Sequence, residues 1–157
     1  MTRWVPYQNA TRTNLKTVGK ISRKSNTSGS GRGNPERDEV HLPLMKLAWN
    51  YPKLCLDGQC LLMHFANERK TTPWYGAILK SMGVTAGVSD LFLAYPTPRY
   101  PGYWIELKHG DNKPTLLQRE FMKRMVAMGY AVDWFNDYRK AWNSILEYIG
   151  DPVQFVI

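Results

Sequence analysis

Apolar residues recur at helical spacing most regularly between Thr115 and Gly129. The apolar positions of this stretch are Leu117, Phe121, Met125 and Met128. Threonine is common at the start of a helix and glycine just after its end, so we expect the helix to run between these two residues. The β-branched and aromatic residues of 130–135 then predict a strand, and Asp137 is expected to cap a final helix.

The segment before Thr115 predicts a helix, a buried strand and a short second helix. The first helix signal begins at Pro35, although Pro43 lacks a backbone N–H and its ring clashes with the preceding helical turn. Residues 59–65 are apolar and lie between turn residues, which predicts a buried strand. Thr72 is expected to cap a short helix that ends at Gly83.

Residues 88–94 and 102–108 predict two further strands, joined by a short proline-rich connection. A short connection favours antiparallel pairing of these two strands. The helix that follows can serve as a crossover, so strands 102–108 and 130–135 are expected to be parallel. The element order therefore predicts an α/β protein with a mixed sheet flanked by helices.

Positive charge is concentrated near the N-terminus. The 157 residues include 21 Lys and Arg and 13 Asp and Glu, a formal net charge of +8. Residues 1–37 contribute +7 of this charge and include a Ser-, Gly- and Asn-rich stretch without apolar periodicity. We therefore expect a flexible basic arm over 1–37 and a folded domain over 38–157. Such an arm either binds phosphate groups without reading sequence or only adds solubility.

The composition argues against membrane proteins and disulfide scaffolds. No apolar run reaches the ~18 residues of a membrane span, and the N-terminus lacks an apolar signal segment. Cys55 and Cys60 are too few for a disulfide scaffold, and together with His64 they lack a fourth zinc ligand. We therefore expect a soluble cytoplasmic protein without a membrane partner.

Three charged residues stand in otherwise apolar strands. Glu106 and Lys108 are two residues apart and project from the same face of one strand, and Asp90 lies in the neighbouring strand. If these strands pair, Asp90 and Glu106 approach each other. A divalent cation removes the repulsion between two such carboxylates, and oxygen ligands favour Mg²⁺ or Mn²⁺.

A Glu-x-Lys pair on a strand is usually an ordinary surface ion pair. Three features favour a catalytic role instead: the carboxylate of Asp90 in the adjacent strand, Gln118 early in the following helix, and the basic character of the chain. A lysine at this place can position the attacking water or neutralise developing charge.

These residues and their neighbours resemble the VRR-NUC domain, a family of the PD-(D/E)xK nuclease superfamily. The resemblance extends from about Glu39 to Ile149, and Ser89 stands where the family most often has proline. It is carried by residues 83–84, 87–91, 104–108, 114–115, 118 and 129–130. The resemblance implies the restriction-endonuclease-like α-β-β-β-α-β core. Standalone members are common in phages and prophages, which implies a bacterial or phage-infected host cell.

The resemblance also implies roles for individual residues. Asp90 and Glu106 would be metal ligands together with the main-chain carbonyl of Leu107, and Lys108 would act on the water. Gln118 would support the site from the helix. The position of Glu39 in the first helix matches a glutamate that many members place near the metal. The metal implied is Mg²⁺ or Mn²⁺.

DNA contacts are expected from basic residues on both sides of this site. Arg23 and Lys24 belong to the basic arm. Residues 64–70 resemble a pattern of phage-type members, in which His64, Asn67 and Lys70 could contact phosphate. Lys113 precedes the helix that carries Gln118 and is a further candidate.

The leading hypothesis is therefore a Mg²⁺- or Mn²⁺-dependent DNA endonuclease that acts by direct attack of water. The resemblance implies selectivity for branched DNA such as four-way junctions. It also implies a homodimer, because symmetric cutting requires two active sites. Two alternatives remain: a non-catalytic basic module that binds nucleic acid, and a nuclease that nicks or cuts duplex DNA.

Overall fold

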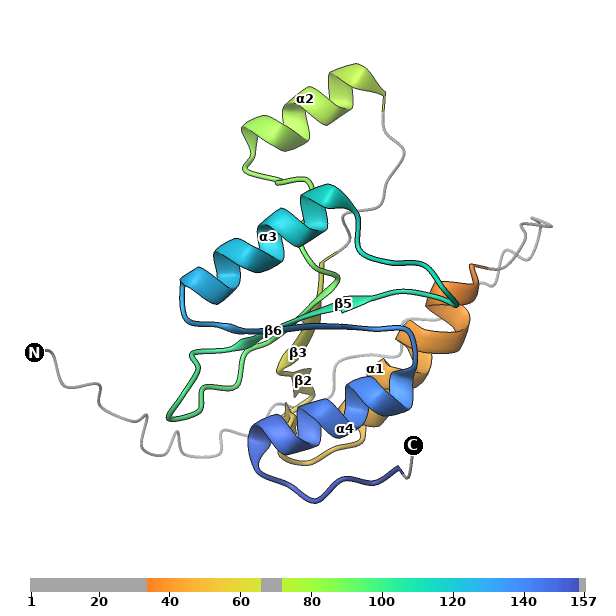
Figure 1. The fold of residues 1–157 in the computed structure, drawn as a ribbon, viewed down its shortest axis with the longest axis vertical. Helices are drawn as coiled ribbons and strands as arrows, with labels where there is room; N and C mark the ends of the chain where they lie inside the picture. Colours follow the sequence, from red (N-terminus) through yellow and green to blue (C-terminus); the bar gives the residue numbers. More distant parts are fainter. Residues whose placement is uncertain (1–33, 66–71, 156–157) are drawn as a thin grey trace, which may run out of the picture. The chain divides into compact units, whose positions relative to one another are not determined.

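A four-stranded sheet lies at the centre of the fold, with the strand order β3-β4-β5-β6 (Figure 1). The structure is a computed structural model that describes residues 34–65 and 72–155. The strands are β3 (Leu62–His64), β4 (Leu91–Leu93), β5 (Tyr103–Leu107) and β6 (Ala131–Phe135).

The pairing of these strands follows from the length of their connections. β4 is antiparallel to β3 and to β5, whereas β5 and β6 are parallel. The chain passes from β5 to β6 through α3 (Leu116–Ala127), the crossover that a parallel pair requires. The predicted directions of both pairs and the mixed α/β sheet are therefore confirmed.

Helices cover the two faces of the sheet unequally. α1 (Leu42–Trp49) and α4 (Tyr138–Ile149) lie on one side and α3 lies on the other (Figure 1). The buried core residues are Val40, Leu44, Ala48, Leu54, Leu62, Leu91, Leu93, Tyr103, Ile105, Leu107, Ala141, Trp142, Ile145 and Leu146. No side chain of α3 is fully buried, and Leu117 and Met128 of its apolar pattern are 59% and 68% exposed. The core therefore lies between the sheet, α1 and α4.

The N-terminal helix continues through Pro43 because the turn before it is widened. η1 (Glu36–His41) is π-helical, and the N–H of Leu42 donates to the carbonyl of Arg37, five residues earlier. Pro43 then occupies the first turn of α1, where a missing N–H costs little. The predicted helix is present as two consecutive segments.

The single strand predicted over 59–65 is wrong in its extent. Asp57 and Gly58 have positive φ angles of 51° and 79° and turn the chain into a small hairpin. The hairpin pairs β1 (Cys55–Leu56) with β2 (Gln59–Cys60), and β3 then begins as a separate strand that pairs with β4. Residues 59–65 are therefore divided between two strands that pair with different partners, β1 and β4. The pattern of hydrophobic residues does not show which strand each residue pairs with.

Side-chain caps begin three helices where the sequence predicts them. Thr72, Thr115 and Asp137 each accept a backbone N–H from the helix that follows, at 3.3, 3.3 and 2.7 Å. The first of these helices is α2 (Pro73–Ser81), none of whose side chains is buried.

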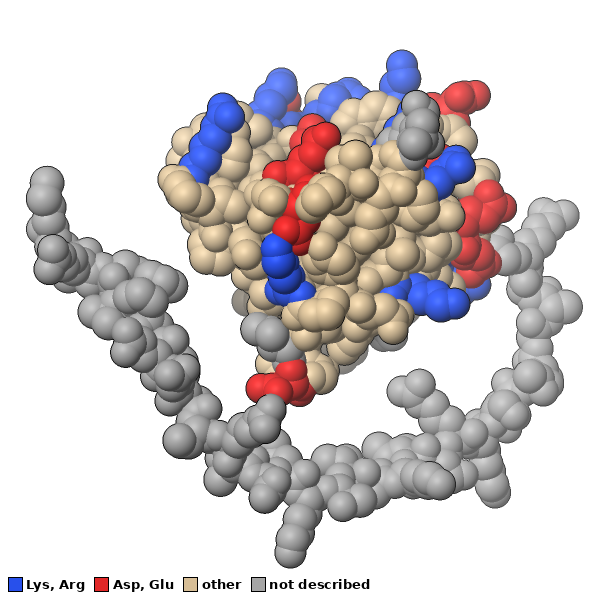
Figure 2. Space-filling view, turned by 90° about the horizontal axis from the view of Figure 1, so that it is seen from below, with Lys and Arg blue, Asp and Glu red and all other residues tan. Residues whose placement is uncertain are grey.

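Charges of both signs are distributed over the described part of the chain. Figure 2 shows Lys and Arg side chains interspersed with Asp and Glu side chains on one face. Residues 1–33, which include most of the predicted basic arm, lie outside the described residues, and η1 begins at Glu36. Within 34–65 and 72–155, no helix has the length and hydrophobicity needed to cross a bilayer.

Gly87 allows the chain to approach α3 closely just before β4. Its φ is 83°, and a Cβ atom there would lie 2.6 Å from the carbonyl carbon of Leu117. Gly83 also has a positive φ, of 89°, but a Cβ atom there would meet nothing within 4 Å. Comparing substitutions at the two glycines therefore separates the energetic cost of a left-handed backbone, which both share, from the cost of a steric clash, which applies only at Gly87.

We expect Gly87→Ala to destabilise the fold more than Gly83→Ala. Each change forces a left-handed backbone on alanine, at a cost of about 1–2 kcal/mol. Gly87→Ala must in addition displace the backbone of α3, which adds about 1–3 kcal/mol. Urea unfolding of the two variants measures the difference, and equal losses of unfolding free energy would contradict the close packing at Gly87.

Candidate active site

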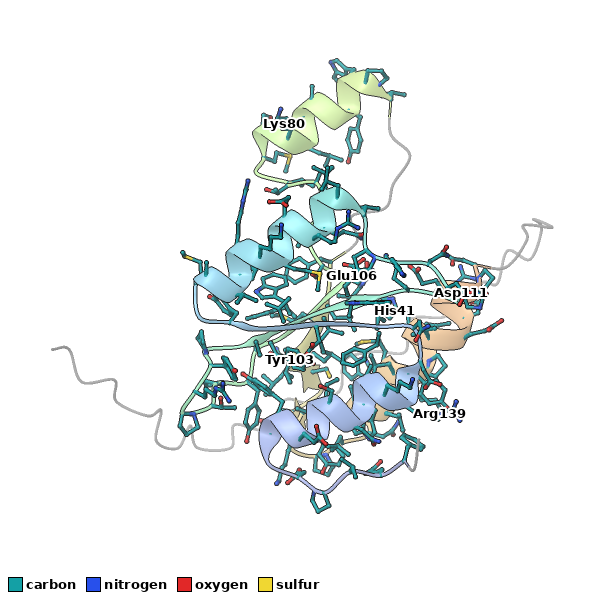
Figure 3. The ribbon with its side chains drawn as sticks, in the orientation of Figure 1. His41, Lys80, Tyr103, Glu106, Asp111 and Arg139 are labelled. Carbon is teal, nitrogen blue, oxygen red and sulfur yellow. The ribbon has the colours of Figure 1, made fainter. Side chains whose placement is uncertain are left out.

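Three charged side chains from neighbouring strands lie together in the structure. Asp90 directly precedes β4, Glu106 lies within β5, and Lys108 directly follows it. Because Leu91 pairs with Ile105 in antiparallel register, Asp90 comes opposite Glu106. Figure 3 shows Glu106 between the sheet and α3.

All three side chains are buried, and their polar contacts are unequal. Asp90, Glu106 and Lys108 are 8%, 0% and 6% exposed. Asp90 Oδ2 accepts the N–H of Leu107 at 2.8 Å. Glu106 Oε1 is 2.6 Å from Lys108 Nζ and also accepts a hydrogen bond from the Gln118 amide. Glu106 Oε2 is buried and has no hydrogen-bond partner among the described residues. The site therefore contains an open carboxylate oxygen beside a second carboxylate.

Gln118 connects the start of α3 to this carboxylate. Its Oε1 accepts the N–H of Thr115 at 2.8 Å, while Thr115 Oγ1 accepts the N–H of Gln118. This reciprocal capping leaves the Gln118 NH₂ group to donate to Glu106. A glutamate at this place would cap the helix equally well but would repel Glu106, so the amide suits both contacts.

Burial raises the pKa of both carboxyl groups. The pKa of Glu106 rises to about 7 because of burial and then the charge of Asp90, with the hydrogen bond to Lys108 opposing the rise. Burial also raises the pKa of Asp90, against the effects of the Leu107 N–H and the Lys108 charge. Burial lowers the pKa of Lys108, but the hydrogen bond and charge of Glu106 outweigh it, and the net pKa is raised. The two carboxylates therefore repel each other beside an ammonium group that stays protonated at neutral pH.

The charge of Glu36 in the first helix acts on this site, whereas Glu39 pairs with His109. The negative charge of Glu36 contributes to raising the pKa of both Glu106 and Lys108. Glu39 Oε2 lies 3.0 Å from His109 Nε2, and its side chain is 68% exposed. In a π-helical turn, residues three apart do not lie one above the other as they do in an α-helix. Glu39 as a metal ligand stays a prediction, and sequence reasoning did not single out Glu36.

His64 lies beside Asp90, and His41 packs against His64. His64 Nδ1 is 3.1 Å from the Asp90 carbonyl oxygen, and its ring contacts His41 edge-on at a centroid distance of 4.3 Å. Burial, followed by the charge of His64, lowers the pKa of His41 to about 4. The sequence singles out His64 but not His41, because the two rings meet only through the packing of the N-terminal helix on β3.

The cysteines do not complete a metal site. Cys55 and Cys60 are paired residues of the β1–β2 hairpin, and burial raises the pKa of Cys60 to about 11. In the part of the chain that the structure describes, no cluster of three or more His, Cys, Asp or Glu residues is arranged to hold a metal ion. Among the described residues, Asp90 and Glu106 are the two carboxylates that lie together in the buried site.

Two of the predicted phosphate contacts, His64 and Lys113, lie among the described residues. Lys113 lines a cavity beside α3. Arg23, Lys24 and Lys70 lie outside the described residues, as does Asn67.

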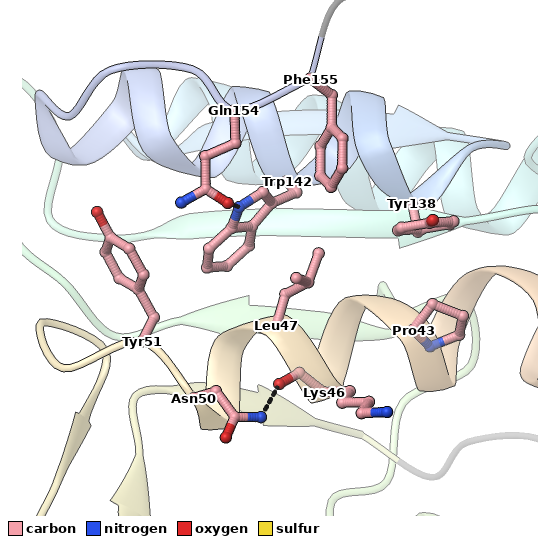
Figure 4. Close-up of a pocket in the computed structure, with 9 residues that line it drawn as sticks. All are labelled: Pro43, Lys46, Leu47, Asn50, Tyr51, Tyr138, Trp142, Gln154 and Phe155. Carbon is pink, nitrogen blue, oxygen red and sulfur yellow. Dashed lines mark hydrogen bonds between the residues drawn. The ribbon is translucent and has the colours of Figure 1, made fainter.

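A separate cavity of about 460 Å³ lies between α1, α4 and the C-terminal segment (Figure 4). Its lining includes Tyr51, Trp142 and Phe155 but no Asp or Glu residue. The Trp142 indole N–H donates to Gln154 Oε1 at 2.8 Å across this lining. Without a carboxylate, this cavity is not a candidate for the metal chemistry considered above.

The sheet, its crossover helix and the paired carboxylates define a nuclease-type α/β fold. Among solved structures, the chain is similar to a VRR_NUC domain protein, with 25% sequence identity and a TM-score of 0.60. The similarity covers 79% of this chain and 99% of that chain. No protein-family model and no curated protein sequence matches the chain. The resemblance to the VRR-NUC domain is therefore confirmed by the three-dimensional fold.

The raised pKa of Glu106 predicts a pH-dependent loss of stability in the metal-free protein. Its ordinary pKa is 4.5 and its pKa in the fold is about 7, so between these values the folded state binds more protons than the unfolded state. The free energy of unfolding should therefore fall as pH rises through this window, by on the order of 3 kcal/mol.

We expect Glu106→Gln to remove most of this fall, because glutamine does not titrate. Urea unfolding in EDTA between about pH 4 and 8 measures the slope. Glu39→Gln is the matched control, since its exposed side chain lies outside the buried pair, and it should retain the wild-type slope. An unchanged slope in Glu106→Gln would contradict the buried, repelling pair.

Proposed function

We propose that this protein is a divalent-metal-dependent endonuclease that hydrolyses phosphodiester bonds in DNA. The observation that carries the proposal is the buried Glu106 Oε2, which has no hydrogen-bond partner among the described residues and lies beside the Asp90 carboxylate. A buried, open anionic oxygen is costly unless a cation or donor satisfies it. The similarity to a VRR_NUC domain protein supports the same class of activity.

The donor atoms fit a hard divalent cation. Asp90 and Glu106 offer carboxylate oxygens, which Mg²⁺ and Mn²⁺ prefer over sulfur or imidazole. We assign the main-chain carbonyl of Leu107 as a further ligand, and Glu36 as an acidic group whose charge strengthens the site. Mg²⁺ usually keeps several waters and takes substrate phosphate oxygens, so two carboxylates are sufficient protein anions.

The residues around this pair have distinct proposed roles. A bound cation of this kind polarises a phosphoryl oxygen and lowers the pKa of a coordinated water. Lys108 is held protonated next to Glu106, so it orients the attacking water and stabilises negative charge on the phosphoryl group instead of acting as a base. Gln118 keeps Glu106 turned so that Oε2 stays open. Water attacks directly, without a covalent enzyme intermediate.

The proposed substrate is branched DNA in the cytoplasm of a bacterial or phage-infected cell. This finer assignment rests on the family resemblance. Contacts to the DNA backbone are proposed for Lys113 and, from outside the described residues, for Arg23, Lys24 and Lys70. Such contacts position DNA without reading its sequence.

We expect Asp90→Asn and Lys108→Met each to reduce cleavage at least about 100-fold while leaving folding and DNA binding intact. Asparagine keeps an acceptor for the Leu107 N–H, and methionine keeps the buried stem of the lysine. The assay incubates labelled four-way junction, flap, single-stranded and duplex DNA with Mg²⁺, Mn²⁺ or EDTA and maps the cuts. Glu39→Gln is the control and should cut like the wild type.

Each alternative gives a different result in this assay. Retained cleavage in both purified variants would rule out the proposed site. Binding of every substrate without metal-dependent turnover would instead indicate a non-catalytic nucleic-acid-binding module. Equal cutting of duplex and branched DNA would indicate a nicking or duplex-cutting nuclease.

We further propose that the protein is a homodimer that pairs through α2. None of the side chains of this helix is buried. Trp74 in its first turn and Met82, the residue that directly follows the helix, are each 74% exposed. A helix of about nine residues is marginal in water without tertiary packing. Its only charged residue is Lys80, which fits an apolar protein surface better than nucleic acid. A second copy would cover this face and supply the second active site that symmetric cutting requires.

Multi-angle light scattering after gel filtration tests the dimer. We expect the wild type to elute at twice its monomer mass and Trp74→Glu/Met82→Glu to elute as a monomer. Val153→Glu, a change at another exposed apolar residue, is the control and should remain dimeric. A monomeric wild type, or a dimer that survives the α2 substitutions, would contradict pairing through α2.

A further inference from the structure

A cavity of about 360 Å³ lies beside α3, on the sheet face that carries Glu106. Its lining residues are Lys113, Pro114, Arg119, Met122, Lys123 and Trp134. Its volume is near the lower end of the range for small-molecule sites, so it suits one small ligand or one unit of a polymer.

The cavity is one strand away from the candidate active site. Trp134 of β6 pairs in parallel register with Glu106 of β5. Paired residues of neighbouring strands project from the same face of a sheet, and strands lie about 4.8 Å apart. Arg119 directly follows Gln118, the residue that donates to Glu106. A ligand in the cavity would therefore lie next to the proposed site of cleavage.

The lining combines an aromatic surface with positive charge. Trp134 is 40% exposed although it belongs to a strand, and Pro114 and Met122 extend the apolar surface. Arg119 Nη1 donates to the Pro114 carbonyl at 2.6 Å, which fixes the guanidinium at the edge of the cavity. Lys123 makes an exposed ion pair with Glu120 at 3.0 Å, a contact that contributes little and is easily exchanged.

We propose that this cavity binds one unpaired nucleotide of a DNA strand, with its base stacked on the indole of Trp134. Lys113, Arg119 and Lys123 then face its phosphates. Three cationic side chains around an aromatic surface complement a ligand that is both flat and anionic. An acidic peptide would match the charge but would gain little from the exposed indole, and an apolar segment would leave the cations without a counter-charge.

The inference deepens the proposed nuclease function and rests on it for the choice of DNA as ligand. A fully paired duplex keeps its bases stacked inside the helix, where Trp134 cannot reach them. A fork, flap or junction offers an unpaired nucleotide at its branch point. Preference for such DNA would therefore come from this cavity, and the carboxylate pair would cut whichever phosphodiester the cavity places beside it.

Fluorescence anisotropy of the full chain in EDTA tests this inference separately from catalysis. The probes are a labelled hairpin duplex and the same hairpin with one unpaired nucleotide, at a fixed salt concentration. We expect the wild type to prefer the second probe and Trp134→Ala to reduce that preference about tenfold. Trp134→Phe keeps an aromatic surface and should retain most of it.

Trp49→Ala is the matched control, because Trp49 is 51% exposed at the end of α1, outside this cavity. It should leave the preference unchanged. Circular dichroism and thermal melting check that each variant is folded.

Three outcomes would overturn the inference. The first is equal affinity of the wild type for the two probes, and the second is an unchanged preference in Trp134→Ala. The third is displacement of the hairpin with the unpaired nucleotide by a poly-glutamate peptide as readily as by single-stranded DNA. Metal-dependent cleavage is scored independently. A chain that cuts DNA but shows no Trp134-dependent preference refutes this inference alone, whereas Trp134-dependent binding without cleavage refutes only the nuclease function.

Discussion

The structure depends on placing two buried carboxylates within reach of each other and keeping them there. Water is excluded from Glu106, so its charge must be balanced by groups of the protein or by a ligand. Lys108 and the Gln118 amide supply part of that balance, while the Leu107 N–H donates to the neighbouring Asp90. They leave one oxygen of Glu106 without a partner among the described residues, and the pKa of both carboxyl groups stays raised. This incomplete balance is the basis of the proposed metal site.

The sheet topology explains how so short a chain builds this arrangement. Antiparallel pairing of β4 with β5 sets Asp90 opposite Glu106, and the alternation of β5 directs Ile105 and Leu107 into the core while Glu106 and Lys108 face α3. The parallel pairing of β5 with β6 requires a crossover, and that crossover is α3, whose first turn carries Gln118. The same crossover leaves Trp134 beside α3 and partly exposed, so that the proposed catalytic and nucleotide-binding residues lie on one face of the sheet.

The elements set by local chemistry could be predicted from the sequence. Thr72, Thr115 and Asp137 cap helices where expected, and connection lengths decided the strand directions. The two-residue spacing of Glu106 and Lys108 predicted that both side chains lie on one face of the sheet, because side chains alternate between the two faces along any strand. Features set by distant contacts could not be predicted in this way. The separate strand β3 depends on its pairing with β4, and the contact between His41 and His64 joins the N-terminal helix to that strand. Exposure of α2 and α3 likewise reflects how little of the fold packs against them.

The most direct test of the central claim is a crystal structure of the protein soaked in Mn²⁺, with anomalous scattering used to locate the metal. The account predicts an anomalous peak in contact with Asp90 and with Glu106 Oε2, while Lys108 remains bonded to Glu106 Oε1. Saturating Mn²⁺ that leaves this place empty, with Glu106 Oε2 bonded to a protein donor, would contradict the account.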